Sequence, residues 1–94
     1  MSEDEFEWDD AKAARNYAAH GVSFEVARAV FDDPLAIDRL DDREDYGEER
    51  TNITGMAQGR LLTVTYTIRG RKLRLISARY AEPYERRSYH EKAR

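Results

Sequence analysis

Residues 60–80 read RLLTVTYTIRGRKLRLISARY. Apolar and polar side chains alternate from Arg60 to Ile68, with the period of two that a β-strand imposes on its two faces. Arg69-Gly70 interrupts the alternation, and glycine readily adopts the positive φ that a tight hairpin turn needs. A second strand then follows from Arg71 to Tyr80. The stretch therefore predicts an antiparallel β-hairpin.

The turn also predicts how the two strands of this hairpin pair. A two-residue loop at Arg69-Gly70 places Ile68 opposite Arg71, and Tyr66 then lies opposite Leu73. In this register apolar residues face apolar residues, whereas a slip by one residue would mix the two faces. One face of the sheet is therefore expected to pack against helices. The other face, which carries threonines and basic residues, is expected to face solvent.

The flanking sequence adds helices and further strands around the hairpin. Asp9 and Ser23 are good helix N-caps, and Gly21 and Pro34 are typical stop signals after a helix. The predicted elements, in order, are helices 11–19 and 23–31, strands 35–40, 50–56, 60–68 and 71–80, and a helix 84–93. Two N-terminal helices, an antiparallel four-stranded β-meander and a C-terminal helix make an α+β fold.

Length and composition exclude several classes of protein. A chain of 94 residues is expected to form a single domain, 1–94, with one modest core. It has no cysteine, which excludes disulfides, thiolate metal sites and a cysteine nucleophile. Its two histidines lack metal-ligand spacing and no glycine-rich phosphate loop occurs, so we expect neither a metal nor another cofactor. Without a long apolar run or a secretory signal, the chain is expected to be cytoplasmic, with no membrane span.

Charge is divided unevenly along the chain. Residues 1–59 carry 6 basic and 16 acidic side chains, whereas residues 60–94 carry 10 basic and 3 acidic ones. A basic half is a candidate surface for binding phosphates. The alternative is that the two halves neutralise each other in the fold.

Short blocks of residues, spread in order over almost the whole chain, resemble one known family. The blocks are Phe6-Glu7-Trp8-Asp9, Lys12, Asn16, His20-Gly21-Val22-Ser23-Phe24, Val30-Phe31-Asp32-Asp33-Pro34, Gly47-Glu48-Glu49-Arg50, Gly59-Arg60-Leu61-Leu62, Arg74-Leu75-Ile76-Ser77-Ala78-Arg79 and Glu85-Arg86-Arg87-Ser88-Tyr89. Across residues 6–91 the chain resembles the BrnT toxins, the ribonuclease partners of BrnA antitoxins in type II toxin–antitoxin systems.

The resemblance implies a fold, an activity and a set of partners. The implied fold is RelE-like, with helices against a curved antiparallel sheet. The implied activity is metal-independent RNA cleavage that inhibits translation. The implied partners are a BrnA-like antitoxin, which neutralises the toxin, and RNA, which is ribosome-associated for some relatives. Operator DNA would be bound only through the antitoxin.

Cleavage of RNA without a metal needs cations that stabilise negative charge on the phosphate in the transition state. Arginine suits this role because its planar guanidinium binds phosphate bidentately and stays charged. Arg50 begins the second predicted strand, and Arg79 lies opposite Arg60 in the predicted register, so Arg60 and Arg79 could flank one phosphate. Regular alternation places Arg79 on the apolar face, where it needs a partner such as Glu49 or Glu85. A structural ion pair is therefore the alternative to a catalytic role for Arg79.

The same reaction needs a base for the 2′-hydroxyl proton and an acid for the leaving 5′-oxygen. The candidates are His20, Glu49 and Tyr89, which complete a predicted catalytic set with Arg50 and Arg79. A free imidazole has a pKa of about 6.5, which suits proton transfer at neutral pH. Each candidate has a structural alternative: His20 caps the end of a helix, Glu49 is solvated or salt-bridged, and Tyr89 packs against the sheet.

A wider set of basic residues is predicted to bind the RNA backbone. The set is Arg60, Lys72, Arg74, Arg86 and Arg87. Neutralising several phosphates predicts that RNA affinity falls steeply as salt increases. Lys12 and Asn16, by contrast, are expected only to be solvated on the first helix.

Two other functions fit the sequence. The chain could bind RNA or the ribosome without cleaving it, or it could bind an antitoxin and regulate transcription together with it. In the latter case the acidic tract 38–49 is expected to pair with a basic antitoxin segment and to steer its association. Cleavage of RNA by the free protein distinguishes these functions from that of a ribonuclease toxin.

Overall fold

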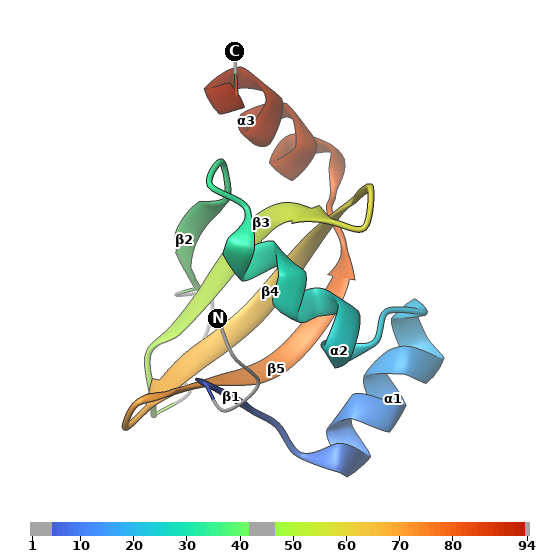
Figure 1. Ribbon diagram of the computed structural model, residues 1–94, viewed down its shortest axis with the longest axis vertical. Helices are drawn as coiled ribbons and strands as arrows, with labels where there is room; N and C mark the ends of the chain where they lie inside the picture. Colours follow the sequence, from blue (N-terminus) through green and yellow to red (C-terminus); the bar gives the residue numbers. More distant parts are fainter. Residues whose placement is uncertain (1–4, 42–46, 94) are drawn as a thin grey trace.

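The computed structural model describes residues 5–41 and 47–93, which form an α+β fold (Figure 1). The elements in order are β1 (Phe6–Glu7), α1 (Asp10–His20), α2 (Phe24–Ala27), the 3₁₀ helix η2 (Arg28–Asp32), β2 (Ile37–Asp41), β3 (Arg50–Ala57), β4 (Arg60–Arg69), β5 (Lys72–Tyr80) and α3 (Pro83–Ala93). The strands form one sheet in the order β1-β5-β4-β3-β2. None of the helices in these two ranges is both long and apolar enough to cross a membrane.

The sheet is mixed, which corrects the predicted four-stranded antiparallel meander. The four predicted strands are present and pair antiparallel with their neighbours in the chain. A fifth strand, β1, pairs parallel to β5, with Phe6 opposite Leu73 and Glu7 opposite Arg74. A strand of two residues is too short to show an alternation of apolar and polar side chains, so the sequence pattern does not predict it.

The register of the β4–β5 hairpin also differs from the prediction. Arg69 pairs with Lys72, so the two-residue loop is Gly70-Arg71 and not Arg69-Gly70. Gly70 has a φ of 59° and is the first residue of the loop, where a type II′ turn favours glycine. The predicted pairing of Ile68 with Arg71 is therefore wrong. The loop has the predicted length of two residues but begins one residue later in the chain.

A β-bulge in β5 changes which face its last residues occupy. Tyr66 pairs with Leu75 and Thr65 pairs with Ser77, so Ile76 has no partner on β4. The extra residue reverses the alternation, and Arg79 lies opposite Thr63, on the face away from Leu75. The predictions that Arg79 shares a face with Leu75 and lies opposite Arg60 are therefore wrong.

Helices cover one face of the sheet and create the core. Figure 1 shows α2 and η2 crossing this face and α1 alongside β5. The buried apolar residues of the core are Phe6, Val22, Phe24, Ala27, Val30, Ile53, Ala57, Leu62, Val64, Leu75 and Ala78. Ile68, which the sequence predicts for this face, is 67% exposed because it lies near the tip of the hairpin.

The opposite face of the sheet is polar, and we call it the polar face. Its polar side chains include those of Arg39, Arg50, Asn52, Thr54, Thr63, Thr65, Ser77 and Arg79, and the apolar Ile37, Met56 and Leu61 lie on the same face near α3. Thr54 and Thr63 share a hydrogen bond of 2.7 Å between their hydroxyls and are only 2% and 1% exposed. The prediction of a solvent-exposed face is therefore wrong at this end of the sheet, where α3 lies.

Candidate active site

A hollow of about 380 Å³ lies where α1 meets the sheet, and we call it the α1 hollow. It is lined by Lys12, Arg15, Asn16, Ala19, His20, Arg50 and Ile76. His20 and Arg50, which the sequence predicts to be catalytic, are 30 positions apart in the chain, and both line this hollow. The fold thus brings two of the five predicted catalytic residues into one site.

Helix periodicity positions the α1 side of the hollow. Asp9 caps the helix by accepting a hydrogen bond from the Lys12 amide at 2.9 Å. Lys12 and Arg15 are three residues apart and therefore project from the same side of α1. Gly21, with a φ of 70°, ends the helix and leaves His20 on its last turn, exposed to solvent.

Asn16 holds this helix against the sheet. It is buried, and its amide group donates to the carbonyl oxygens of Val22 at 3.0 Å and Ala78 at 2.9 Å. Its carbonyl oxygen accepts from the Ala78 amide at 3.0 Å. The prediction that Asn16 is solvated is therefore wrong. Asn16 holds α1, which carries Lys12, Arg15 and His20, against β5.

The α1 hollow is cationic. Lys12, Arg15, His20 and Arg50 line it, and none of the other described residues that line it is an aspartate or a glutamate. Arg50 donates to Glu48 through Nε at 3.4 Å, and its side chain is 23% exposed. Cations gathered in a concave site can stabilise the additional negative charge that a phosphate develops in a transition state. The arrangement therefore suits a phosphodiester.

Two basic residues of the hollow, Lys12 and Arg15, are not among the site residues that the sequence predicts. The sequence predicts only solvation for Lys12 and no role for Arg15. Their three-residue spacing on α1, which ends at the predicted catalytic residue His20, is the signal that could have identified them. Helical periodicity places basic residues on one side of α1, but it does not show that this side faces Arg50.

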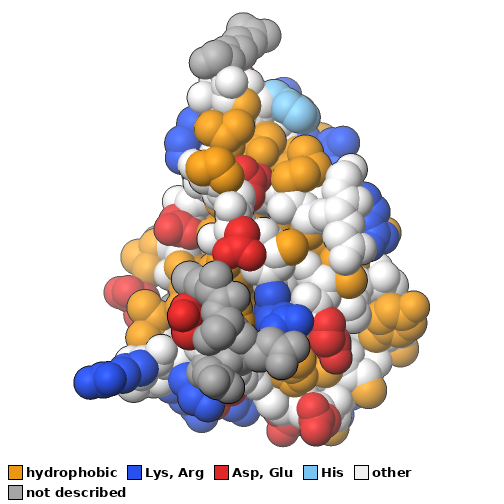
Figure 2. Space-filling model, in the orientation of Figure 1, with side chains coloured by type: hydrophobic (Ala, Val, Ile, Leu, Met, Phe, Trp, Pro, Cys, Tyr) orange, Lys and Arg blue, Asp and Glu red, His pale blue; other side chains and the backbone are white. Residues whose placement is uncertain are grey.

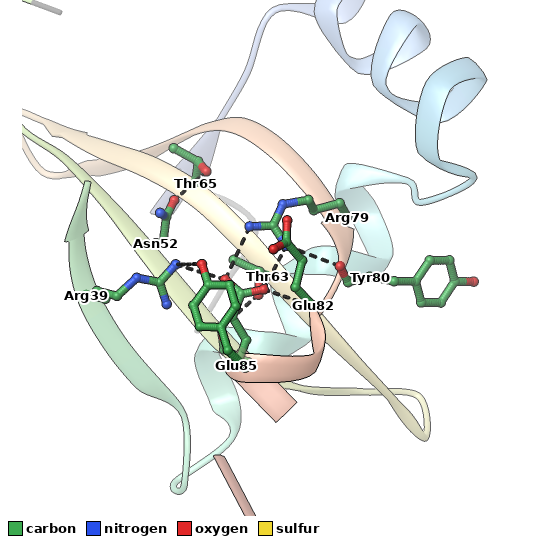
Figure 3. A network of polar contacts seen from close by, with 10 residues as sticks. Arg39, Asn52, Thr63, Thr65, Arg79, Tyr80, Glu82 and Glu85 are labelled. Atoms are coloured by element: carbon green, nitrogen blue, oxygen red, sulfur yellow. Dashed lines mark hydrogen bonds and ion pairs between the residues drawn. The ribbon is translucent and has the colours of Figure 1, made fainter. Parts of the chain in front are cut away.

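Arg79 is held in an ion-pair network on the polar face (Figure 3). Its guanidinium donates to both carboxylate oxygens of Glu85, at 2.7 and 3.2 Å. Arg39 donates to the same carboxylate at 2.8 Å, and the Glu82 amide donates at 2.8 Å. The Glu85 side chain has no exposed surface. Of the alternatives that the sequence left open, Arg79 thus has Glu85 as its partner.

The network shifts the pKa values of both groups. Burial alone would raise the pKa of Glu85, but the hydrogen bonds from Arg79, the Glu82 amide and Arg39 outweigh it and lower the pKa to about 2. The hydrogen bond to Glu85 raises the pKa of Arg79. Both groups are therefore charged at neutral pH, and a phosphate would have to compete with a buried carboxylate for Arg79.

Tyr89 and Glu49 also lie outside the α1 hollow. The Tyr89 hydroxyl donates to Asp33 at 2.7 Å, which raises the pKa of the phenol and ties α3 to the end of η2. Glu49 is exposed and lines a separate hollow of about 260 Å³ with Glu48 and Tyr66, among others. The structure therefore does not bring either residue together with His20.

The predicted RNA-binding residues fall into separate groups. Lys72 and Arg74 lie at the start of β5, where Arg74 pairs with Glu7 at 2.7 Å. Arg86 and Arg87 are exposed on α3, at the opposite end of the molecule in Figure 1. On the α2 face, acidic and basic side chains are interspersed (Figure 2). The predicted set thus forms no single surface.

The remaining predictions concern metals and the acidic tract. Residues 5–41 and 47–93 contain no group of three or more histidine, aspartate or glutamate side chains that could hold a metal ion. The acidic tract 38–49 lies partly outside the described residues, at positions 42–46.

Comparison with known proteins identifies the family. No curated protein sequence matches the chain. A family model described as the ribonuclease toxin, BrnT, of type II toxin–antitoxin systems matches residues 8–85, which include every residue of the α1 hollow. The match covers most of the chain and agrees with the resemblance read from its sequence blocks. The chain therefore belongs to the BrnT family of ribonuclease toxins.

Proposed function

We propose that this chain is a metal-independent endoribonuclease that cleaves RNA in the α1 hollow and thereby inhibits translation. Its family supports ribonuclease activity and a protein antitoxin as partner. The observation that carries the proposed site is that His20, Arg50, Lys12 and Arg15, from α1 and β3, line one hollow. The protein would act in the cytoplasm, with a RelE-like fold, and a BrnA-like antitoxin would neutralise it.

In the proposed reaction the 2′-hydroxyl of RNA attacks the adjacent phosphorus. His20 accepts the hydroxyl proton as the general base. Lys12, Arg15 and Arg50 stabilise the negative charge on the pentacoordinate phosphorus. The bond from phosphorus to the 5′-oxygen then breaks, which leaves a 2′,3′-cyclic phosphate and a free 5′-hydroxyl.

The leaving 5′-oxygen must gain a proton, and Lys12 is the proposed donor. Arginine side chains remain protonated in proteins, so they stabilise charge but do not exchange protons. Among the described residues that line the hollow, His20 and Lys12 are therefore the side chains suited to transfer a proton. The catalytic roles predicted for Glu49, Arg79 and Tyr89 remain predictions, and all three lie outside the hollow.

Cleavage of end-labelled single-stranded RNA in the presence of EDTA tests the proposal. Wild-type protein is expected to give 2′,3′-cyclic phosphate ends, and His20→Asn to lower the rate by about a hundredfold or more. Arg15→Ala should slow cleavage, whereas Arg71→Ala, which removes an exposed arginine of the β4–β5 loop, should not. Circular dichroism of each variant checks that it is folded.

Three results would contradict the proposed function. They are loss of activity with EDTA, products that end in a 3′-hydroxyl, and full activity of a folded His20→Asn variant. If free RNA is not cleaved, the same variants should be compared in a translation assay containing ribosomes. Translation unaffected by the wild-type protein would then rule the proposal out.

A further inference from the structure

A second concave surface lies between α3 and the β3–β4 turn, and we call it the α3 groove. It has a volume of about 250 Å³. It is lined by Gly59 of the turn and by the side chains of Met56, Arg60, Leu61, Tyr80, Arg86 and His90. Arg86 and His90 are four residues apart on α3 and so lie on one side of that helix.

Within the described part of the chain, Arg60 and Arg86 of this groove have no acidic partners. Among the residues that the structure describes, neither Arg60 nor Arg86 has a carboxylate oxygen within 4.0 Å. Arg60 instead donates to the Tyr80 hydroxyl at 2.7 Å, and its guanidinium lies 5.6 Å from the centre of the Tyr80 ring. This contact holds Arg60 at the groove while leaving its charge uncompensated.

Apolar surface accompanies these charges. Tyr80 is 46% exposed and Met56 is 36% exposed. Leu35 is also exposed. It lies near Met56 and α3, since the Asp33 carboxylate accepts hydrogen bonds from the amides of Leu35 and Met56 and from the hydroxyl of Tyr89. Figure 2 shows hydrophobic side chains gathered at the α3 end of the molecule. Exposed apolar patches of this kind mark interaction sites.

The composition of the groove favours a protein ligand over RNA. Tyrosine, methionine and arginine are the residue types enriched in protein interfaces and their energetic centres. Single-stranded RNA is usually held by successive bases stacked on several aromatic rings, whereas the described residues give this groove only the rings of Tyr80 and His90, and Arg60 already lies over Tyr80. The groove is also remote from the α1 hollow, since Arg50 and Met56 are near opposite ends of β3, about 20 Å apart.

We propose that the α3 groove is a docking site for an acidic segment of the antitoxin, with an apolar side chain between carboxylates. The apolar side chain would pack on Met56 and Leu61, and the carboxylates would accept hydrogen bonds from Arg60 and Arg86. The inference rests on the antitoxin partner that the family implies. It does not depend on whether the free chain cleaves RNA, so the two proposals can fail independently.

The affinity of the purified antitoxin encoded with this chain tests the proposal. Arg86→Glu is expected to raise the dissociation constant at least tenfold, because it places a negative charge against the acidic segment. Met56→Glu should also raise the dissociation constant, because it removes part of the apolar surface on which the antitoxin side chain would pack. Arg87→Glu is the matched control: it makes the same charge change at the next residue of α3, outside the groove, and should alter the constant by less than twofold.

Three results would overturn the inference. The first is an equal loss of affinity for Arg86→Glu and Arg87→Glu, which would indicate a general charge effect. The second is an antitoxin affinity within twofold of wild type for both groove variants when each is folded. The third is impaired RNA cleavage by Arg86→Glu with unchanged antitoxin affinity, which would assign the groove to RNA. If the wild-type chain does not cleave RNA but Arg86→Glu alone weakens antitoxin binding, the groove proposal stands and the ribonuclease proposal fails.

Discussion

At the scale of single residues, His20 and Arg79 show two uses of a polar side chain. His20 is exposed at the end of α1 and lines the α1 hollow, so its imidazole is accessible to a substrate. Arg79 donates to both oxygens of Glu85, which is fully buried. Removing one member of such a pair leaves an uncompensated buried charge. The geometry therefore favours a structural role for Arg79 over phosphate binding.

We expect Glu85 to make the stability of the fold depend on pH. Its pKa is about 2 in the folded chain, compared with an ordinary value of 4.5. Because the folded value is the lower one, ionised Glu85 stabilises the fold above pH 4.5, and this contribution is lost as the pH falls toward 2. Urea denaturation between about pH 6 and pH 3 measures the loss.

Two variants separate this effect from the titration of other carboxylates. Glu85→Gln should lose less stability than the wild type over the acidic range, because it has no proton to gain. Glu91→Gln changes an exposed glutamate of the same helix and should follow the wild-type curve. Equal slopes for the wild type and Glu85→Gln would show that Glu85 does not cause the dependence.

At the scale of elements, the side-chain amide of the buried residue Asn16 holds α1 in position against the sheet. Asn16→Ala leaves the Ala78 amide and the Val22 and Ala78 carbonyl oxygens without their side-chain partner, so the free energy of unfolding should fall by about 2 kcal/mol. Cleavage should slow as well, because α1 carries three residues of the proposed site. Urea denaturation and the RNA assay measure the two effects. Tyr17→Ala, at a position 60% exposed on the same helix, is the control.

A free energy of unfolding within about 0.5 kcal/mol of wild type for Asn16→Ala would contradict this account of α1. Unchanged cleavage by a destabilised but folded variant would separate the position of α1 from activity and weaken the proposed site.

The elements also show where prediction from sequence succeeds. The caps at Asp9 and Ser23 and the alternation in residues 60–68 are local signals, and helices and strands occur where they predict them. The bulge at Ile76 has no local signal, because it depends on which β4 residues are available for pairing. The extra residue of the bulge places Arg79 on the polar face, opposite Thr63 and not Arg60, so the predicted Arg60–Arg79 site is wrong.

At the scale of the whole molecule, the site could be predicted only in part. The chemistry of the side chains and the family resemblance select His20 and Arg50, but neither shows that α1 packs beside the bulge of β5. That placement comes from long-range contacts such as those between Asn16 and Ala78. For the same reason, a basic half of the sequence does not become a basic half of the structure. Its arginines are distributed between the hairpin, the sheet and α3.

This distribution predicts how RNA affinity depends on salt. The chain has a formal net charge of −3, so RNA should be held mainly where several cations line one hollow. If Lys12, Arg15 and Arg50 each neutralise one phosphate, the logarithm of affinity should fall with the logarithm of salt concentration with a slope of about −2. Fluorescence anisotropy of labelled single-stranded RNA with the His20→Asn variant, in which cleavage is slowed, measures this slope.

Further variants in the same background assign the slope to residues. Lys12→Ala should make it shallower by about 0.7, the value expected for one phosphate contact of a single strand, whereas Lys72→Ala should leave it unchanged. A slope of about −6 would instead mean that the hairpin and α3 bind the backbone as well, as the charge of residues 60–94 predicts. RNA would then have to follow the surface from one end of the molecule to the other. In that case the α1 hollow would only be the point of cleavage along a longer binding path.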